Sequence, residues 1–284
     1  MHLSPLCQAS SRITFIHRYR KLRRIRLTLP MRRRIKCKTT EKQSKMTARE
    51  LSFLKEKFSD EELDAAIKRV QSGEPLAYVL GEWYFYGLTF SLNSDCLIPR
   101  PDTEHVVEKA IQTLPKGGRF IDLCTGSGCI AVSVLKNRPD LTAYALDISA
   151  LALEKAKSNA ATNGVDDRIE FILADIFKLD ANTLPEFDAV ISNPPYIRSA
   201  VVKTLDVAKT EPITALDGGE DGLDFYRFIL EKYRSRLSQN GNFIFEIGYD
   251  QGADVLSLAE ASGLSCQIFK DYSQNDRVAL IGRS

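Results

Sequence analysis

Histidine is scarce in this sequence, and long hydrophobic runs are missing. Only three histidines occur among the 284 residues, and His105 is the only one beyond residue 45. Chemistry that depends on a histidine base therefore has almost no candidate. No stretch of 18 or more apolar residues occurs, so we expect no membrane-spanning helix and no membrane partner.

Cysteine is present but has no recognisable spacing. The six cysteines are Cys7, Cys37, Cys96, Cys124, Cys129 and Cys266. No two of them form a Cys-x-x-Cys pair, and the histidines do not cluster with them. This arrangement predicts neither a metal site nor a disulfide framework, and it is typical of a reducing compartment.

Acidic residues are nearly absent from one end of the chain. Residues 1–45 contain 14 Lys or Arg, and their only acid is Glu41. The rest of the chain has 25 basic against 36 acidic residues, a net charge near −11. We expect residues 1–45 to be a disordered extension. Three interpretations stay open: an organelle transit segment, an arm that contacts RNA, or upstream sequence translated ahead of a start at Met46, which we favour.

A helix and a hairpin are predicted ahead of the main domain. Ser59 can cap a helix, Glu62 follows three residues later, and apolar residues recur at helical spacing as far as Val70. The segment 75–99 combines aromatic and β-branched residues with turn signals, which predicts a short β-hairpin. A stiff, charged loop then leads into a helix over about 105–113.

Strands and helices alternate from Arg119 onward, which predicts a doubly wound parallel sheet. The expected strands cover 120–123, 141–146, 169–174, 187–192, 242–247, 264–269 and 277–281, with helices over 129–137 and from the cap Ser149 to Asn159. The expected fold class is therefore α/β, in a Rossmann-like arrangement of seven strands.

A glycine-rich turn and three acids lie at the ends of these strands. The turn Thr125-Gly126-Ser127-Gly128 follows the first strand, where glycine lets the backbone approach a ligand and the next helix offers free N–H groups. Asp122 precedes the turn, Asp147 ends the second strand and Asp175 ends the third. The turn alone is compatible with NAD, FAD or S-adenosylmethionine.

The surroundings of the turn favour S-adenosylmethionine. The turn lacks the third glycine that close packing of a pyrophosphate requires. Asp122 would attract an α-ammonium group but repel a pyrophosphate, and Asp147 suits ribose hydroxyls. Asp175 would lie near an adenine edge, although it could instead cap a helix from Ile176 onward.

The sequence Asn193-Pro194-Pro195-Tyr196 follows the buried strand that ends at Ser192. Ligands bind at the carboxyl ends of the strands in an open α/β sheet, and the two prolines make this loop rigid. A rigid loop with a side-chain amide suits a planar amide or an amino group as its ligand.

Several motifs together resemble the PrmC (HemK) family over about residues 59–284. They are 73–78, 98–104, 122–128, 193–196, 211–212 with 221–223, and 276–278. Members of this family are S-adenosylmethionine-dependent N5-glutamine methyltransferases of peptide chain release factors. The resemblance implies the same fold and cofactor, with the glutamine of a Gly-Gly-Gln motif as substrate.

For the cofactor, the resemblance implies a methionine-side loop over 125–128, with Asp147 on the ribose and Ile176 near the adenine. The expected cofactor-binding residues are Asp122, Cys124, Thr125, Gly126, Ser127, Gly128, Asp147, Asp175, Ile176 and Asn193. Cys124 stands where many relatives have glycine, and we expect it to be a small packing residue and not a nucleophile. No metal is expected.

For the substrate, the resemblance assigns the glutamine to Asn193, Pro194, Pro195 and Tyr196. We expect the Asn193 side-chain oxygen and the Pro194 carbonyl to accept hydrogen bonds from the glutamine amide, and Tyr196 to pack on the glutamine side chain. Asn193, Pro194 and Tyr196 would thus be the catalytic residues. Arg100 is also expected in the substrate site. It begins the sequence Arg100-Pro101-Asp102, where related enzymes that act on a ribosomal protein typically have Arg-Ser-Pro, so the resemblance favours release factors as substrates.

The resemblance also predicts a division of the chain into domains. A basic extension over 1–45 precedes a shortened helical docking region over 46–73, in which about one helix is evident. A hairpin linker over 74–104 leads to the methyltransferase domain over 105–284. We expect a monomer in the bacterial cytoplasm, or in an organelle if residues 1–45 are a transit segment.

Two other functions stay open. An N6-adenine methyltransferase of DNA or RNA would use the same tetrad on an exocyclic amine, but the acidic core disfavours nucleic acid except through residues 1–45. A non-catalytic S-adenosylmethionine-binding assembly or RNA-binding factor would act through the same extension. The intact tetrad argues against this last function.

Overall fold

The computed structural model describes residues 46–283, and the predictions for residues 1–45 lie outside them. The described chain begins with α2 (Ala48–Lys57) and α3 (Asp60–Gln71), which pack through a small apolar cluster with α4 (Leu76–Leu80). The sequence predicts about one helix over 46–73, and the structure adds a second one, α2.

Both helices have a capping box, in which a glutamate of the first turn accepts a hydrogen bond from the residue that caps the helix. The Glu50 carboxylate accepts a hydrogen bond from the Thr47 backbone N–H at 2.7 Å, and that of Glu62 accepts one from the Ser59 N–H at 3.2 Å. Leu54 is the only buried residue of α2, so hydrophobic periodicity does not reveal this helix. The capping pattern is the signal that identifies it.

The predicted hairpin is present but shorter than expected. It consists of β1 (Glu82–Phe85) and β2 (Leu88–Ser91), which pair antiparallel. Part of the predicted range folds instead as α4, which ends at Gly81 with a φ of 68°. This left-handed conformation favours glycine and terminates the helix just before the first strand.

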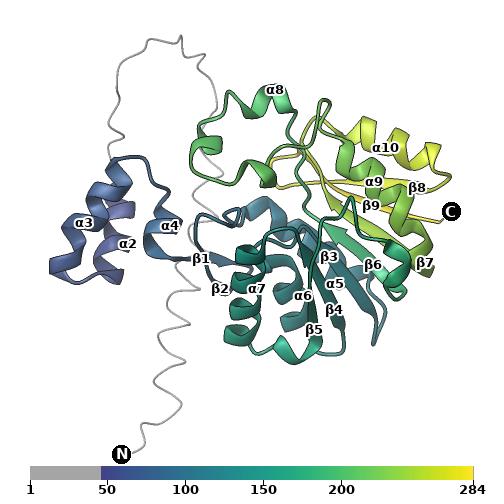
Figure 1. Cartoon of the computed structure of the whole chain (residues 1–284), viewed down its shortest axis with the longest axis horizontal. Helices are drawn as coiled ribbons and strands as arrows, with labels where there is room; N and C mark the ends of the chain where they lie inside the picture. The colour runs from purple at the N-terminus through teal and green to yellow at the C-terminus, as the bar shows by residue number, and fades with distance from the viewer. Residues whose placement is uncertain (1–45, 284) are drawn as a thin grey trace, which may run out of the picture. The chain divides into compact units, whose positions relative to one another are not determined.

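A seven-stranded sheet forms the centre of the described chain and confirms the predicted fold class (Figure 1). Its strands are β3 (Arg119–Leu123), β4 (Thr142–Asp147), β5 (Ile169–Leu173), β6 (Phe187–Ser192), β7 (Leu237–Glu246), β8 (Ser265–Lys270) and β9 (Asp276–Gly282). The strand order is β5-β4-β3-β6-β7-β9-β8. Only β9 runs against its two neighbours, β7 and β8.

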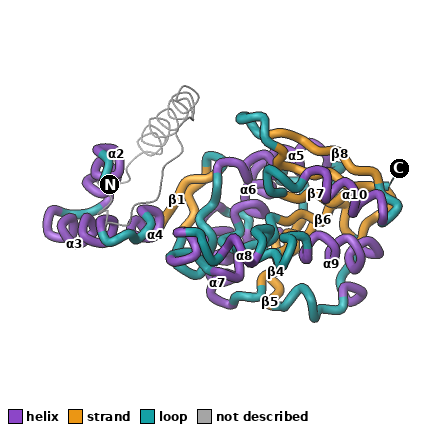
Figure 2. Tube along the Cα trace, turned by 90° about the horizontal axis from the view of Figure 1, so that it is seen from above, coloured by secondary structure: helices purple, strands orange, loops and turns teal. Residues whose placement is uncertain are grey.

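Helices cover both faces of the sheet, as the strands and helices of Figure 2 show. On one face lie α5 (Glu104–Thr113), α6 (Cys129–Asn137) and α7 (Ala150–Asn163), and on the other α9 (Asp224–Tyr233) and α10 (Gly252–Ala261). Successive residues of β3 alternate between the two layers, with Phe120 in the first apolar cluster and Ile121 in the second.

The remaining elements are short. They are α8 (Ser199–Val202) and the 3₁₀ turns η2 (Pro101–Thr103), η3 (Asp166–Arg168), η4 (Ala181–Thr183), η5 (Asp206–Lys209), η6 (Ile213–Ala215) and η7 (Arg234–Arg236). Among the helices of residues 46–283, none has the length and apolar character that crossing a bilayer requires.

Asn159 joins the hairpin to the large domain. Its Oδ1 accepts a hydrogen bond from the Ser91 N–H at 2.7 Å, and its Nδ2 donates to the carbonyls of Ser91 at 3.1 Å and Ser127 at 2.9 Å. The side chain is 1% exposed. The helix predicted to end here continues to Asn163 and is terminated by Gly164, whose φ of 66° is left-handed.

Replacing this buried amide should destabilise the fold. Asn159→Leu keeps a similar volume but leaves the Ser91 N–H and the Ser127 carbonyl without partners, so we expect the free energy of unfolding to fall by about 2–4 kcal/mol. Urea denaturation measures this change. As a control, Asn182→Ala at an exposed position should alter it by less than about 0.5 kcal/mol. Equal stability of Asn159→Leu and the wild type would contradict the assigned bonds.

Candidate active site

The glycine-rich turn after β3 is a tight loop. Cys124, Gly126 and Gly128 have positive φ angles of 59°, 56° and 78°, in the region that favours glycine. A Cβ atom on Gly128 would lie 3.1 Å from the Cβ atom of Ala156 in α7. The turn therefore needs glycine both for its backbone conformation and for its contact with a neighbouring helix.

Asp122 lies beneath this loop at the end of β3 and is fully buried. Its Oδ2 accepts hydrogen bonds from the Thr125 hydroxyl at 2.7 Å and from the Ala131 N–H at 3.3 Å, whereas Oδ1 has no partner. Burial raises the pKa of Asp122 from 3.8 to about 7, because loss of water disfavours the charged form. Such an unsatisfied carboxylate favours a cation nearby.

Asp147 connects the end of β4 to the loop and to the start of α7. Its Oδ2 accepts a hydrogen bond from the Gly126 N–H at 2.8 Å, and its Oδ1 accepts one from the Ser149 N–H at 2.9 Å. Burial also raises the pKa of this carboxyl group. Ile148 and Leu151, which follow it, are more than half exposed, so apolar surface lies next to the carboxylate.

Asp175 has local partners. Its Oδ1 accepts a hydrogen bond from the Phe177 N–H at 3.0 Å, and its carboxylate pairs with the Lys178 ammonium at 2.9 Å, which lowers the pKa of Asp175. The residues after it form a turn and not the alternative helix. Ile176 is 5% exposed and packs in the apolar cluster that includes α9. The roles of Asp175 and Ile176 toward an adenine stay predictions.

The Asn193–Tyr196 tetrad leaves the sheet beside the glycine-rich loop. Ser192 of β6 pairs with Leu123 of β3, so the two loops begin at adjacent positions on the same edge. The two prolines are buried, and Asn193 and Tyr196 are partly exposed. The structure thus brings the expected catalytic residues next to the expected cofactor loop.

Polar side chains behind the tetrad hold its two functional groups. Asn193 Nδ2 donates to the Thr103 hydroxyl oxygen at 3.3 Å, and the Tyr196 hydroxyl donates to Glu246 Oε1 at 3.3 Å. Gln251 Nε2 donates to the Tyr196 carbonyl at 3.0 Å. Burial is the main cause that raises the pKa of the Tyr196 phenol, so Tyr196 is a hydrogen-bond donor at neutral pH.

Sequence reasoning does not identify Thr103, Glu246 and Gln251 as site residues. All three are polar residues with at most 3% exposure. Glu246 has a detectable signal, because it is an acid that ends an apolar strand, as Asp147 does. Thr103 and Gln251 have no such signal, since only the tertiary structure brings them to the tetrad.

Arg100, predicted to contact substrate, has a structural partner. Its Nη2 lies 2.5 Å from Glu211 Oε1, and the Ile98 N–H donates to the other oxygen of this carboxylate at 3.2 Å. Glu211 is 6% exposed, so the pair joins the loop before α5 to the segment between η5 and η6. A contact between Arg100 and substrate stays a prediction.

The Cys124 thiol is unsuited to nucleophilic chemistry. Burial raises its pKa, and the protonated thiol is a poor nucleophile. The role of Cys124 as a packing residue stays a prediction.

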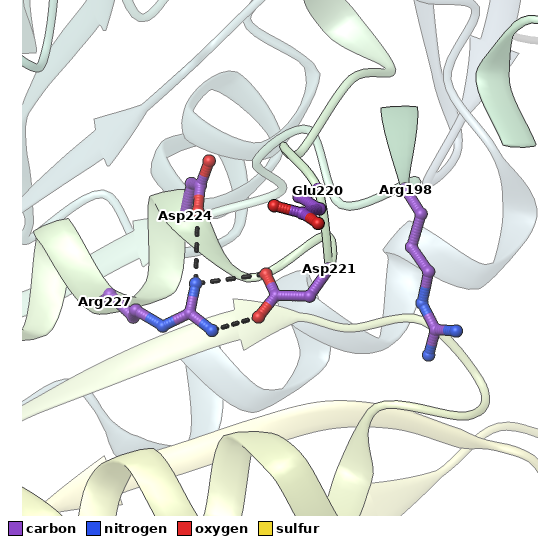
Figure 3. Close-up of a pocket in the computed structure, with 5 residues that line it drawn as sticks. All are labelled: Arg198, Glu220, Asp221, Asp224 and Arg227. Atoms are coloured by element: carbon purple, nitrogen blue, oxygen red, sulfur yellow. Dashed lines mark hydrogen bonds and ion pairs between the residues drawn. The ribbon is translucent and has the colours of Figure 1, made fainter. Parts of the chain in front are cut away.

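The structure also contains a cavity of about 510 Å³. It is lined by Arg198, Glu220, Asp221, Asp224 and Arg227. Figure 3 shows Arg227 turned toward Asp221 and Asp224, with which it forms ion pairs. None of the predicted site residues lines this cavity. We therefore place the candidate active site at the strand ends.

Comparison with known proteins defines the class. The family model of the methyltransferase small domain matches residues 104–211, which contain both the glycine-rich loop and the tetrad. The hMettl16 catalytic domain, solved in complex with the MAT2A 3'UTR hairpin 6, is 21% identical with a TM-score of 0.54, over 70% of this chain and 76% of that one. That likeness shows the fold alone. The class is a Rossmann-like methyltransferase.

Curated relatives identify the family within this class. The release factor glutamine methyltransferase of Aquifex aeolicus (strain VF5) is 38% identical over 220 residues, which are 76% of this chain and 78% of the relative. That of Neisseria gonorrhoeae (strain ATCC 700825 / FA 1090) is 42% identical over 76% of this chain and 80% of the relative. The chain belongs to the release factor glutamine methyltransferase family, as its motifs indicate.

Asp122→Asn should be more stable than the wild type at pH 8 but not at pH 4. Because folding raises the pKa of Asp122 to about 7, the stability that this group contributes is full below about pH 4 and is lost as the pH rises to about 7. Asparagine does not titrate, so its advantage should grow to about 2–4 kcal/mol over that range. Urea unfolding at pH 4, 6 and 8 measures it.

A carboxylate with the opposite behaviour is the matched control. Arg138 lowers the pKa of the exposed Asp140 by hydrogen bonding, so Asp140→Asn should be the less stable protein at pH 8 and lose this deficit in acid. A stability difference between Asp122→Asn and the wild type that does not change with pH would contradict a buried, titrating Asp122.

Proposed function

We propose that this chain transfers a methyl group from S-adenosylmethionine to the side-chain amide nitrogen of the glutamine in the Gly-Gly-Gln motif of peptide chain release factors. One observation carries the proposal: the rigid loop that bears Asn193 leaves β6 next to the glycine-rich loop that leaves β3. The names of the relatives supply the substrate class.

The residues at the ends of β3 and β4 fit S-adenosylmethionine. Oδ1 of Asp122 is a buried acceptor without a partner, and its negative charge suits an α-ammonium group above the loop. Asp147 is partly exposed beside apolar surface, a combination that suits a nucleoside. The full proposed set is Asp122, Cys124, Thr125, Gly126, Ser127, Gly128, Asp147, Asp175, Ile176 and Asn193. When bound, this cofactor supplies a methyl group on a positively charged sulfonium.

The tetrad would orient the substrate amide. An amide nitrogen is a poor nucleophile, because its lone pair is delocalised into the carbonyl, so correct placement contributes much of the rate. Asn193 Oδ1 and the Pro194 carbonyl would accept hydrogen bonds from the two N–H groups of the glutamine. Tyr196 would pack on the glutamine side chain and exclude water. The proton of the product amide would pass to water after transfer.

The docking of the release factor belongs to the same proposal. We assign it to residues 46–73, with 74–104 as linker and 105–284 as the methyltransferase domain. The described part of the first region is two helices, α2 and α3, and the chain matches about four-fifths of the relatives' length. A monomer and the compartment stay predictions.

A methyl-transfer assay tests the proposed function directly. Full-length protein and residues 46–284 are incubated with labelled S-adenosylmethionine and one of three substrates: a release factor with Gly-Gly-Gln, its Gln→Ala variant, or DNA and RNA oligonucleotides. We expect label on the wild-type release factor alone. Label on the oligonucleotides would indicate adenine methylation, and no label with any substrate would favour a non-catalytic role.

Asn193→Ala should abolish turnover but largely retain cofactor binding, because the other proposed cofactor-binding residues stay in place. The substitution removes the proposed acceptor for the substrate amide, so we expect turnover to fall by at least about 100-fold, with the dissociation constant of S-adenosylmethionine within about threefold of wild type. The same labelled assay and isothermal titration calorimetry measure the two quantities. Activity within about threefold of wild type would exclude this role for Asn193.

Cofactor affinity should depend on the protonation of Asp122. With a pKa of about 7 in the free protein, the carboxyl group is mostly neutral at pH 5.5, so the dissociation constant of S-adenosylmethionine should be about tenfold higher there than at pH 7. Calorimetry in two buffers should detect proton release on binding. In Asp122→Asn most of this pH dependence should be lost, and a variant with the wild-type profile would refute the assignment.

A further inference from the structure

A buried glutamate lies directly behind the tetrad. Ser192 of β6 pairs with Phe245 of β7, so Asn193 and Glu246 follow at adjacent strand ends. Glu246 is 1% exposed, and its Oε2 has no partner with hydrogen-bond geometry. A carboxylate in such a position costs free energy unless surrounding groups stabilise its charge.

Several groups stabilise that charge. The Tyr196 hydroxyl donates to Oε1 at 3.3 Å. The Thr103 hydroxyl also interacts with the carboxylate and, together with the positive charge of Arg277, opposes the rise that burial causes in the pKa of Glu246. Arg277 is 8% exposed and extends from β9, where its Nη1 donates to the Ile247 carbonyl at 3.2 Å.

The Arg277 guanidinium forms ion pairs with two other acids. Its Nη2 lies 3.4 Å from Asp271 and 3.8 Å from Asp102. The positive charge of Arg277 therefore offsets part of the negative charge of the acids behind the tetrad.

These contacts define a direction of hydrogen bonding. A carboxylate only accepts hydrogen bonds, and a threonine hydroxyl has one proton to donate. If Thr103 gives this proton to Glu246, its oxygen is left to accept from Asn193, and the structure shows Asn193 Nδ2 donating to it. Thr103 precedes α5, but its side chain makes no capping bond to that helix. Its hydroxyl is thus free for the tetrad.

We infer that Glu246 is a positioning residue: through Thr103 it fixes the Asn193 amide with nitrogen inward and oxygen outward. The outward oxygen selects a substrate group that donates N–H, which an amide or amine does. A flipped Asn193 would place a donor there and repel it. This inference rests on the proposed function for its catalytic consequence, but the amide orientation is a property of the protein alone.

Two substitutions of Thr103 separate the hydroxyl from the shape of the side chain. Thr103→Val keeps the shape and removes the hydroxyl, whereas Thr103→Ser retains the hydroxyl. We expect turnover on the release factor to fall by about 10- to 100-fold in Thr103→Val and to stay within about threefold of wild type in Thr103→Ser. The dissociation constant of S-adenosylmethionine should change by less than about twofold in both. Equal turnover of the two variants would overturn the inference.

The variant Glu246→Gln tests whether Glu246 sets the orientation of the Asn193 amide. A glutamine can donate to the Thr103 oxygen, which frees the Thr103 proton for Asn193 Oδ1 and reverses the amide. We expect a loss of turnover similar to that of Thr103→Val. If Glu246→Gln does not fold, the two Thr103 variants still decide the matter.

A substrate-independent measurement distinguishes failure of this inference from failure of the proposed function. The Asn193 side-chain NH₂ signal in nitrogen-15 NMR spectra is identified by its loss in Asn193→Ala. Its hydrogen exchange should be at least about fivefold faster in Thr103→Val than in the wild type and Thr103→Ser. A wild type with no methyl transfer would refute the proposed function only, whereas unchanged exchange in Thr103→Val would refute the inference.

Discussion

The register of the parallel strands is the constraint on which the site depends. Leu123 of β3 pairs with Ser192 of β6, which pairs in turn with Phe245 of β7. Three chain segments therefore leave the sheet side by side, and each bears a polar residue at or next to its last buried position. Because side chains alternate along a strand, a slip of one residue would turn these groups to the other face. No loop contact could restore the site after such a slip.

Two buried carboxylates at this edge have opposite environments. Asp122 has two hydrogen-bond donors but no cation among its contacts, and burial raises its pKa to about 7. For Glu246, the positive charge of Arg277 opposes the rise in pKa that burial causes. Asp122 can therefore be stabilised by a positively charged ligand. The charge of Glu246 is instead stabilised by a cationic group of the protein. This difference suits a cationic cofactor over β3 and a fixed protein framework behind the tetrad.

The sequence could predict the sheet, the glycine-rich loop and the tetrad, because each depends on local patterns. Apolar strands ending in Asp147 or Ser192 are visible in the order of residues alone. Hydrophobic periodicity does not predict the helix α2, because this helix buries a single leucine. No local pattern identifies Thr103 either, because its role depends on a contact between η2 and the end of β6, 90 residues further along the chain. Contacts of that kind have no local signature.

The rigidity of the tetrad backbone and the orientation of the Asn193 amide have different origins. The prolines fix the backbone and are buried, but they cannot choose between the two orientations of the Asn193 amide, which differ only by an exchange of oxygen and nitrogen. That choice requires an asymmetric partner. Thr103 becomes asymmetric only when a pure acceptor takes its proton, and Glu246 is a pure acceptor when ionised. A buried acid that weakens the fold can therefore be retained because it gives the neighbouring amide one direction.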